Sequence, residues 1–323
     1  DPVEGIRSQA ARRRAGRQRG DMGLVAEATF AMAYIHGGMG SHVRSFRHFC
    51  RAAQAQPGTV ETDRFQNRFL AGVEALNSGH YALSQRLLAV SEGWSLNAKV
   101  PVLLNLMQLR LGDIGRAVSS ADNIDLEPVR RDFPVLLVHA HVRAELDQVE
   151  GRDPGLGLKR RLEQMLALGM SEPLAGLMTW ELQRRTFCAS DRLVAGEALL
   201  AALRRTGFGD ARHIPVLLDV AEARAETEAP GSEQLAAEAA RLLRRGCSYL
   251  TLYMPEGLAR CARLLRESDP REAAALVHVA RRWVEHALRH LPSGAEESFT
   301  RHVVVNRLLL GGDEQAIYLQ PLR

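Results

Sequence analysis

The chain has 323 residues, of which 46% are hydrophobic and 25% are charged, and its formal net charge is +4. This composition is typical of a folded globular protein and excludes a chain that is disordered throughout. No apolar run approaches the roughly 18 residues that a membrane-spanning helix needs, so no membrane association is expected.

Residues 1–22 form a basic segment that is expected to be helical or partly ordered. It holds the one arginine cluster that stands out: Arg12, Arg13, Arg14, Arg17 and Arg19. Nucleic-acid binding requires a clustered basic face, but a solvated helix face explains the same run of charges. Direct nucleic-acid binding is therefore not expected. The chain begins with Asp1 and Pro2, without an initiator methionine or an apolar signal sequence, so we expect a fragment of a longer protein.

Apolar residues recur at helical spacing along the chain, and Gly, Pro, Asp and Ser divide it into helices of about 12 to 20 residues. Within residues 23–130 these breaks predict three antiparallel helix pairs. The pairs are 24–36 with 41–55, 63–77 with 81–92, and 100–111 with 114–121.

The glycines that mark the turns of these pairs, Gly40, Gly79 and Gly112, recur at intervals of 39 and 33 residues. Tetratricopeptide repeats have a period of about 34 residues. The third pair, with Leu111-Gly112-Asp113-Ile114-Gly115-Arg116-Ala117, resembles the turn of that family and the small residue at which its two helices cross. Further matching positions are Gly40, Ala52 and Pro57 in the first pair, and Gly72 and Gly79 in the second.

The helical pattern continues over residues 131–292 with a fainter consensus. It predicts helices over 134–149, 156–168, 173–187, 191–205, 214–226, 232–245, 255–266 and 270–290. Ser232 and Asp269 are the expected start signals of two of them. Within residues 293–323, one helix over 296–310 is expected to cover the end of the array. The predicted fold is an all-α, right-handed superhelical solenoid of about seven tetratricopeptide-like pairs plus this capping helix.

A second resemblance lies in Trp283-Val284-Glu285-His286, Ser298-Phe299-Thr300 and Val305-Asn306-Arg307-Leu308-Leu309. These residues are similar to the end of the helical sensor region of large bacterial signal-transduction ATPases and transcriptional regulators. The family's proline before the asparagine is replaced here by Val305. The resemblance implies ligand sensing or partner binding.

Motifs for catalysis or cofactor binding are weak. The stretch Gly37–Ser41 has the glycines of a phosphate-binding loop but no lysine. His286 and His290 would share one face of a helix, with His278 further along it, but no third ligand is evident and surface histidines explain the set, so no metal site is predicted. His139 and His141 point to different faces of one helix.

The four cysteines form no CxxC pair, which favours free thiols in a reducing, cytoplasmic compartment. Cys247 is the most exposed-looking of them. No enzyme activity and no cofactor are expected.

The first helix of each stacked pair should line a concave face, where polar residues that interrupt the apolar stripe are candidates for binding. These candidates are Glu27, Tyr34, Asn67, Glu74, Asn105, Gln108, His141, Glu145, Glu181 and Arg184. The sequence thus predicts a binding module in which a protein or peptide is the first choice of partner and a small-molecule inducer the second. An assembly scaffold and, at lower weight, a helical enzyme or metal-binding protein are the alternatives.

Overall fold

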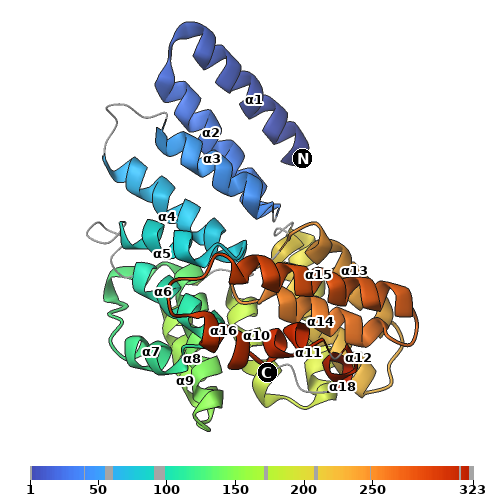
Figure 1. Ribbon diagram of the computed structural model, residues 1–323. Helices are drawn as coiled ribbons and strands as arrows, with labels where there is room; N and C mark the ends of the chain where they lie inside the picture. The colour runs from blue at the N-terminus through green and yellow to red at the C-terminus, as the bar shows by residue number, and fades with distance from the viewer. Residues whose placement is uncertain are drawn as a thin grey trace.

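The computed structural model describes residues 2–39, 41–54, 61–90, 99–170, 174–206, 210–247, 249–312 and 314–319. Over these residues the chain forms eighteen α-helices and two short 3-10 helices, with no β-strand (Figure 1). The prediction of an all-helical protein is therefore confirmed. Among the described helices, none is long and apolar enough to span a membrane.

The α-helices are α1 (Pro2–Arg19), α2 (Met22–Gly38), α3 (His42–Gln54), α4 (Glu61–Asn77), α5 (Tyr81–Ala89), α6 (Lys99–Arg110), α7 (Ile114–Ala121), α8 (Phe133–Val149), α9 (Pro154–Ala167), α10 (Leu174–Thr186), α11 (Ala189–Thr206), α12 (His213–Glu226), α13 (Ser232–Arg244), α14 (Met254–Leu265), α15 (Pro270–Leu288), α16 (Glu296–Arg301), α17 (Val304–Leu310) and α18 (Glu314–Leu319). The 3-10 helices are η1 (Glu127–Val129) and η2 (Asp210–Arg212).

Several helices begin at an aspartate whose carboxylate accepts a hydrogen bond from a backbone N–H of the first turn. Asp132, Asp153 and Asp269 do this for α8, α9 and α15, and each is followed by a proline in that turn. The first-turn N–H groups have no partner within the helix, and proline lacks one, so this combination fixes the start. The Asp269 signal is confirmed. The Ser232 signal is wrong, because Gly231 occupies the cap position and the Ser232 hydroxyl donates to the Ala221 carbonyl, 2.8 Å away.

Each helix from α1 to α14 packs against its successor in the chain. A second set of contacts joins helices that are next but one along the chain: α4 to α6, α6 to α8, α8 to α10, and α12 to α14. In these four cases the first helix of one predicted pair packs on the first helix of the next pair as well as on its own partner.

One hydrogen bond recurs in three successive helix pairs. In α2/α3 the Ser45 hydroxyl donates to the Ala33 carbonyl, and in α4/α5 the Ser84 hydroxyl donates to the Gly72 carbonyl. In α6/α7 the direction is reversed, and the Asn105 amide donates to the Ala117 carbonyl. Each bond joins residues 12 apart in the chain, and the sets are displaced by the same 39 and 33 residues as the turn glycines. The three pairs are thus equivalent in structure at this position.

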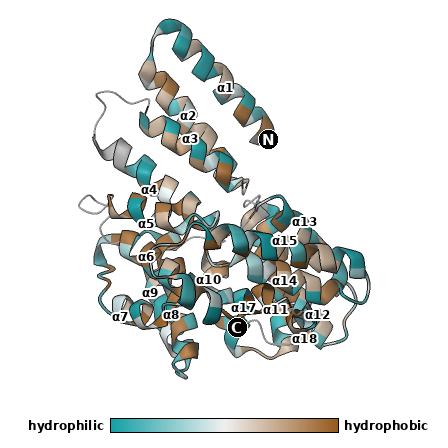
Figure 2. Cartoon of the chain, viewed as in Figure 1, coloured by the Kyte–Doolittle hydropathy of each residue, from teal (hydrophilic) through white to brown (hydrophobic). Residues whose placement is uncertain are grey.

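The apolar core is continuous from Leu76 to Ile317, whereas α2 and α3 contribute to a separate, smaller cluster around Phe49. In Figure 1 helices α1–α3 extend away from the remaining helices, and Figure 2 shows α1 as largely hydrophilic. We call residues 2–54 the arm and the described residues from 61 onward the body.

The two ends of the body meet. The ring of Tyr81, at the start of α5, packs edge-on against Trp283 of α15 and Phe299 of α16, with centroids 6.5 and 6.0 Å apart. The Arg110 guanidinium at the end of α6 donates to the Leu250 and Leu252 carbonyls at 2.7 and 3.2 Å. We call this contact region the closure.

The helix predicted over 296–310 is divided into α16 and α17 by an extended Val303. The cause is the buried Asn306 side chain, which accepts from the Tyr253 hydroxyl at 2.9 Å and donates to the Phe299 carbonyl at 3.0 Å. An unbroken helix would use that carbonyl internally. The predicted features Gly40 and Pro57, and the helix bounds at 55, 92 and 173, lie outside the described residues.

Cys247 is buried and its thiol donates to the Met39 carbonyl, 3.0 Å away, so it is not the most exposed thiol. Of the four cysteines, Cys188 is the exposed one.

Candidate functional site

The ten residues predicted to line a groove lie in three different environments. Glu27 and Tyr34 are exposed on α2, where Glu27 pairs with Arg12 of α1 at 3.2 Å. The other eight are buried or half-buried in the packing between helices. Polar residues that interrupt the apolar stripe therefore mark helix contacts more often than an open surface.

Four of the predicted residues lie on α4 and α6, where their side chains are buried or half-buried against neighbouring helices. Glu74 accepts from His42 Nδ1 at 2.5 Å and from the Ser45 hydroxyl at 3.0 Å, both on α3. Asn67 is buried in α4. Asn105 holds the Ala117 carbonyl as described above, and the Gln108 side chain accepts from the Ser120 hydroxyl at 2.8 Å. Glu74 thus joins the first helix pair to the second, whereas Asn105 and Gln108 join the two helices of the third pair.

The remaining four, His141 and Glu145 of α8 and Glu181 and Arg184 of α10, are brought together in one cluster. Arg185, which the sequence analysis did not select, completes it: its guanidinium pairs with Glu181 and lies 2.5 Å from the Glu145 carboxylate. His141 Nδ1 lies 3.3 Å from Glu181 Oε2. Glu181 and Arg185 have almost no exposed side-chain surface.

The cluster continues into α12 and α14. Asp219 accepts from Trp180 Nε1 at 3.0 Å and from the Arg260 guanidinium at 2.5 Å, while Arg260 also pairs with Glu222 at 2.6 Å. We call the whole set, on α8, α10, α12 and α14, the ion-pair network. It crosses the helices that pack next but one along the chain.

Pairing with opposite charges keeps Glu181 and Arg260 ionised despite their burial. Burial alone would raise the pKa of the Glu181 carboxyl, but the Arg184 and Arg185 guanidiniums outweigh it and hold that pKa well below its usual range. Burial would likewise lower the pKa of Arg260, yet Glu222 and Asp219 raise it well above the ordinary value. Because each charge already has its partner, the network is suited to holding helices in register.

On the other side of α8, facing α7 and α9, lies a cavity of about 330 Å³. Its polar lining comes from five side chains: Asp122, His139, Arg143, Asp147 and Arg161. The volume falls within the range of about 300 to 1,000 Å³ that is typical of small-ligand sites.

Two groups in this lining lack a protein partner. His139 is 4% exposed, and neither of its ring nitrogens has a hydrogen-bond partner among the described residues. Burial, reinforced by Arg161 and Arg143, lowers the pKa of His139 to about 3, so the imidazole is neutral at physiological pH.

Arg161 is half-buried and forms no ion pair with any described residue. Burial and the nearby Arg143 lower its pKa. Arg143 instead pairs with Asp122 at 2.5 Å and approaches Asp147 at 3.7 Å.

His139 and His141 are two residues apart on α8, and the structure places one on the cavity and the other in the ion-pair network. The prediction that they face different directions is confirmed. The cavity could not be predicted from the sequence, because the residues that α7 and α9 contribute to its lining form no recognisable motif. The histidines that could hold a metal ion, His80, His286 and His290, lie outside it.

A scan of the chain against protein-family models finds no match, and a search of curated protein sequences finds no significant match.

Proposed function

We propose that the chain is a non-enzymatic binding module of tetratricopeptide-like helix pairs, the sensor or interaction region of a bacterial signalling protein or transcriptional regulator. The observation that carries the proposal is the cavity between α7, α8 and α9, in whose lining the His139 ring has no hydrogen-bond partner and Arg161 no ion-pair partner among the described residues. A buried polar group without a partner costs free energy that a bound molecule can recover.

The chemistry of the lining points to a small organic anion. The Arg161 guanidinium lies close to Arg143 and has no acidic partner of its own, so a carboxylate or phosphate group would be its natural counter-charge. The neutral His139 ring can donate one hydrogen bond and accept another. Ser, Thr, Cys, Tyr and Lys are absent from the cavity lining, which favours binding over covalent catalysis.

Helix α8 offers a route from the cavity to the rest of the molecule. It carries His139 and Arg143 on the cavity side, and His141 and Glu145 in the ion-pair network. A shift of α8 on ligand binding would thus act on α10 through Glu181 and Arg185, and from there on α12. Such a chain of paired side chains supports a sensor role.

The test is a thermal-unfolding screen of carboxylates and phosphate esters against their neutral alcohols as matched controls. At least one anion should raise the melting temperature of the intact chain, and Arg161→Gln should abolish that rise. Arg160→Gln is the control, because Arg160 is the exposed neighbour outside the lining. No stabilising anion, or an equal loss in both variants, would contradict a small-ligand site.

The arm favours a second candidate, an assembly scaffold. Residues 1–54 contain nine arginines against four acidic residues, so this segment has a formal charge of +5 and the rest of the chain one of −1. Tyr34 and Val43 are 64% and 48% exposed there. A basic surface with exposed apolar groups suits an acidic protein partner. Sedimentation at increasing concentration separates this role from that of a monomeric sensor.

A further inference from the structure

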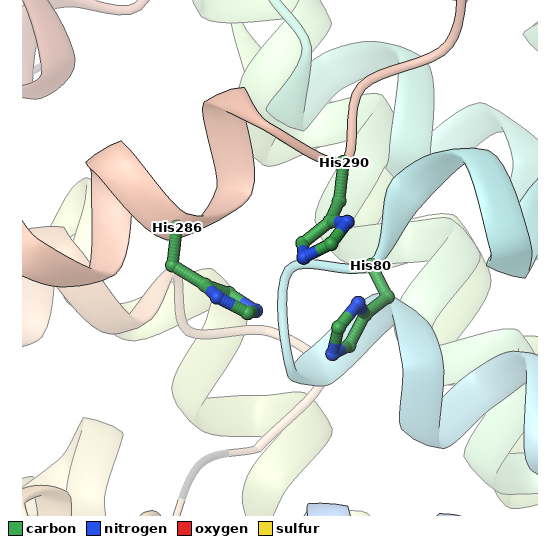
Figure 3. A group of neighbouring side chains, drawn as sticks. All are labelled: His80, His286 and His290. Atoms are coloured by element: carbon green, nitrogen blue, oxygen red, sulfur yellow. The ribbon is translucent and has the colours of Figure 1, made fainter.

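Three imidazoles from distant parts of the chain meet at the closure (Figure 3). His286 lies in the last turn of α15, His290 follows the end of that helix, and His80 occupies the turn between α4 and α5. The ring centroids are 4.7 Å apart for His80 and His286, 4.4 Å for His80 and His290, and 4.6 Å for His286 and His290. One nitrogen from each ring lies within 4.8 Å of the others.

From these positions we propose that His80, His286 and His290 form a binding site for a divalent transition-metal ion of the zinc type. Imidazole nitrogens are ligands for Zn²⁺, Cu²⁺ and Ni²⁺, whereas Ca²⁺ and Mg²⁺ prefer oxygen. Zinc–nitrogen bonds of about 2.0 to 2.1 Å in a tetrahedral site place the nitrogens roughly 3.4 Å apart. Small ring rotations bring the three side chains from their present separation to that distance.

The backbone holds the three residues in place. Gly79 has a φ of +79°, and a Cβ there would lie 3.2 Å from both Ala287 Cβ and Trp283 Cζ2 of α15, so only glycine permits this close approach. The Ala82 N–H donates to the His290 carbonyl at 2.8 Å. The turn that carries His80 is thereby fixed against the end of α15.

The rings themselves are free to take a ligand. All three are half-buried, and none has a hydrogen-bond partner among the described residues. Burial and the neighbouring histidines lower the pKa values of His80 and His286, which favours the neutral form that metals require. Arg289 also lowers the pKa of His286, so the ion would bind beside one positive charge. Three protein nitrogens leave a fourth position for water.

A metal ion at this site would join the first and last parts of the body. His80 precedes Tyr81, and His286 follows Trp283, two of the aromatic residues of the closure. The ion would add a coordinate link to a contact otherwise made by ring packing and hydrogen bonds. Metal binding should therefore stabilise the closure as well as occupy the site.

The test is calorimetric titration of the full, chelator-treated chain with Zn²⁺. One ion should bind per chain, and His80→Ala, His286→Ala and His290→Ala should each weaken binding by at least about tenfold, because a lost ligand matters no less than a lost supporting contact. His278→Ala is the matched control, since His278 is an exposed histidine of the same helix outside the triad. Its affinity should equal that of the unmodified chain.

Two further measurements do not depend on the folding of any variant. Co²⁺ bound to the unmodified chain should give the visible absorption of a nitrogen-coordinated tetrahedral ion, without a thiolate charge-transfer band. Zn²⁺ should slow hydrogen exchange in residues 78–82 and 287–291 together. A thiolate band, which would point to the exposed Cys188, overturns the proposal. So does the absence of zinc binding, unchanged affinity in His80→Ala, or an equal loss in His278→Ala.

Discussion

At the scale of single residues, two histidines of α8 that are two positions apart lie in opposite environments. His141 lies among Glu181, Arg184 and Arg185, whereas His139 lies beside the cavity with both ring nitrogens unpartnered. Protonation of His139 is therefore unfavourable, because the added charge would lie near the guanidiniums of Arg161 and Arg143. No carboxylate of the described residues is hydrogen-bonded to the ring.

We expect His139→Gln to make the free energy of unfolding less dependent on pH between neutral and acid conditions. The pKa of His139 is about 3 in the folded chain and near 6.5 when unfolded, so between these values the unfolded state binds the proton first. The contribution of His139 to the free energy of unfolding is fully present above pH 6.5, and it decreases by about 1.4 kcal/mol per pH unit as the pH falls towards 3. Glutamine cannot titrate and removes this dependence. Urea unfolding at several pH values between 7 and 4 measures it.

His278→Gln provides the comparison, since His278 is an exposed histidine outside the cavity lining. Equal slopes in the unmodified chain and in His139→Gln would show that the His139 ring is protonated as readily in the fold as in solution.

Part of this site could be predicted from the sequence. Helical spacing placed His139 and His141 on different faces and selected four members of the ion-pair network. It could not pair them, because Glu181 lies 40 residues from His141 and Arg260 lies 41 residues from Asp219, and only packing decides which helices meet. His80 is the extreme case, since its neighbours are His286 in the last turn of α15 and His290 just after that helix.

At the scale of elements, glycines inside helices have two unlike roles. Gly196 in α11 faces Trp180 of α10 and Val220 of α12, and an added Cβ would overlap Val220 and lie 2.8 Å from Trp180 Cη2. Gly115 in α7 faces open space, with nothing within 4 Å of such an atom. The first allows three helices to pack closely, and the second only loosens its helix.

Gly196→Ala and Gly115→Ala should accordingly change stability in opposite directions. The first is expected to cost about 1 to 3 kcal/mol through overpacking, and the second to gain up to about 1 kcal/mol through helix propensity. Denaturant midpoints of the two variants at constant m-value measure both. A gain in Gly196→Ala would contradict overpacking at that site, and a loss of stability in Gly115→Ala would contradict the helix-propensity argument.

Helix positions were largely predictable because their start signals are local. An aspartate followed by a proline acts within one turn, so the α15 start could be predicted without knowledge of its neighbours. The break between α16 and α17 could not, because it depends on Tyr253 and Asn306 meeting across helices. Local rules fail where a buried polar side chain competes for a helical carbonyl.

At the scale of the whole molecule, the arm and the body differ in how they are stabilised. The body holds the large core, in which Ile214, Leu217 and Val220 of α12 are fully buried, and a second, small cluster around Leu88. The arm joins only the small cluster of Ala33, Phe49 and Ala71. Less apolar surface is buried per residue in the arm, so its helices should open at lower free energy.

Native-state hydrogen exchange of the intact chain checks this expectation. Amides of α1 and α3 should exchange through local opening, well before those of α12 and α14, whose exchange should require global unfolding. Raising the denaturant concentration should accelerate exchange in α12 strongly and in α3 weakly, because only the former exposes a large surface. Equal protection in α3 and α12 would mean that the arm and the body unfold as one unit.

The closure also constrains the order in which the chain can acquire its structure. Tyr81 is synthesised well before Trp283 and Phe299, the two rings against which it packs. Helices α4–α6 therefore leave the ribosome with an apolar surface that stays uncovered until α15 and α16 follow, and contacts between such distant residues form slowly. During that interval the nascent chain presents a natural binding surface for chaperones, and the last ring contacts should form the final, rate-limiting step of folding.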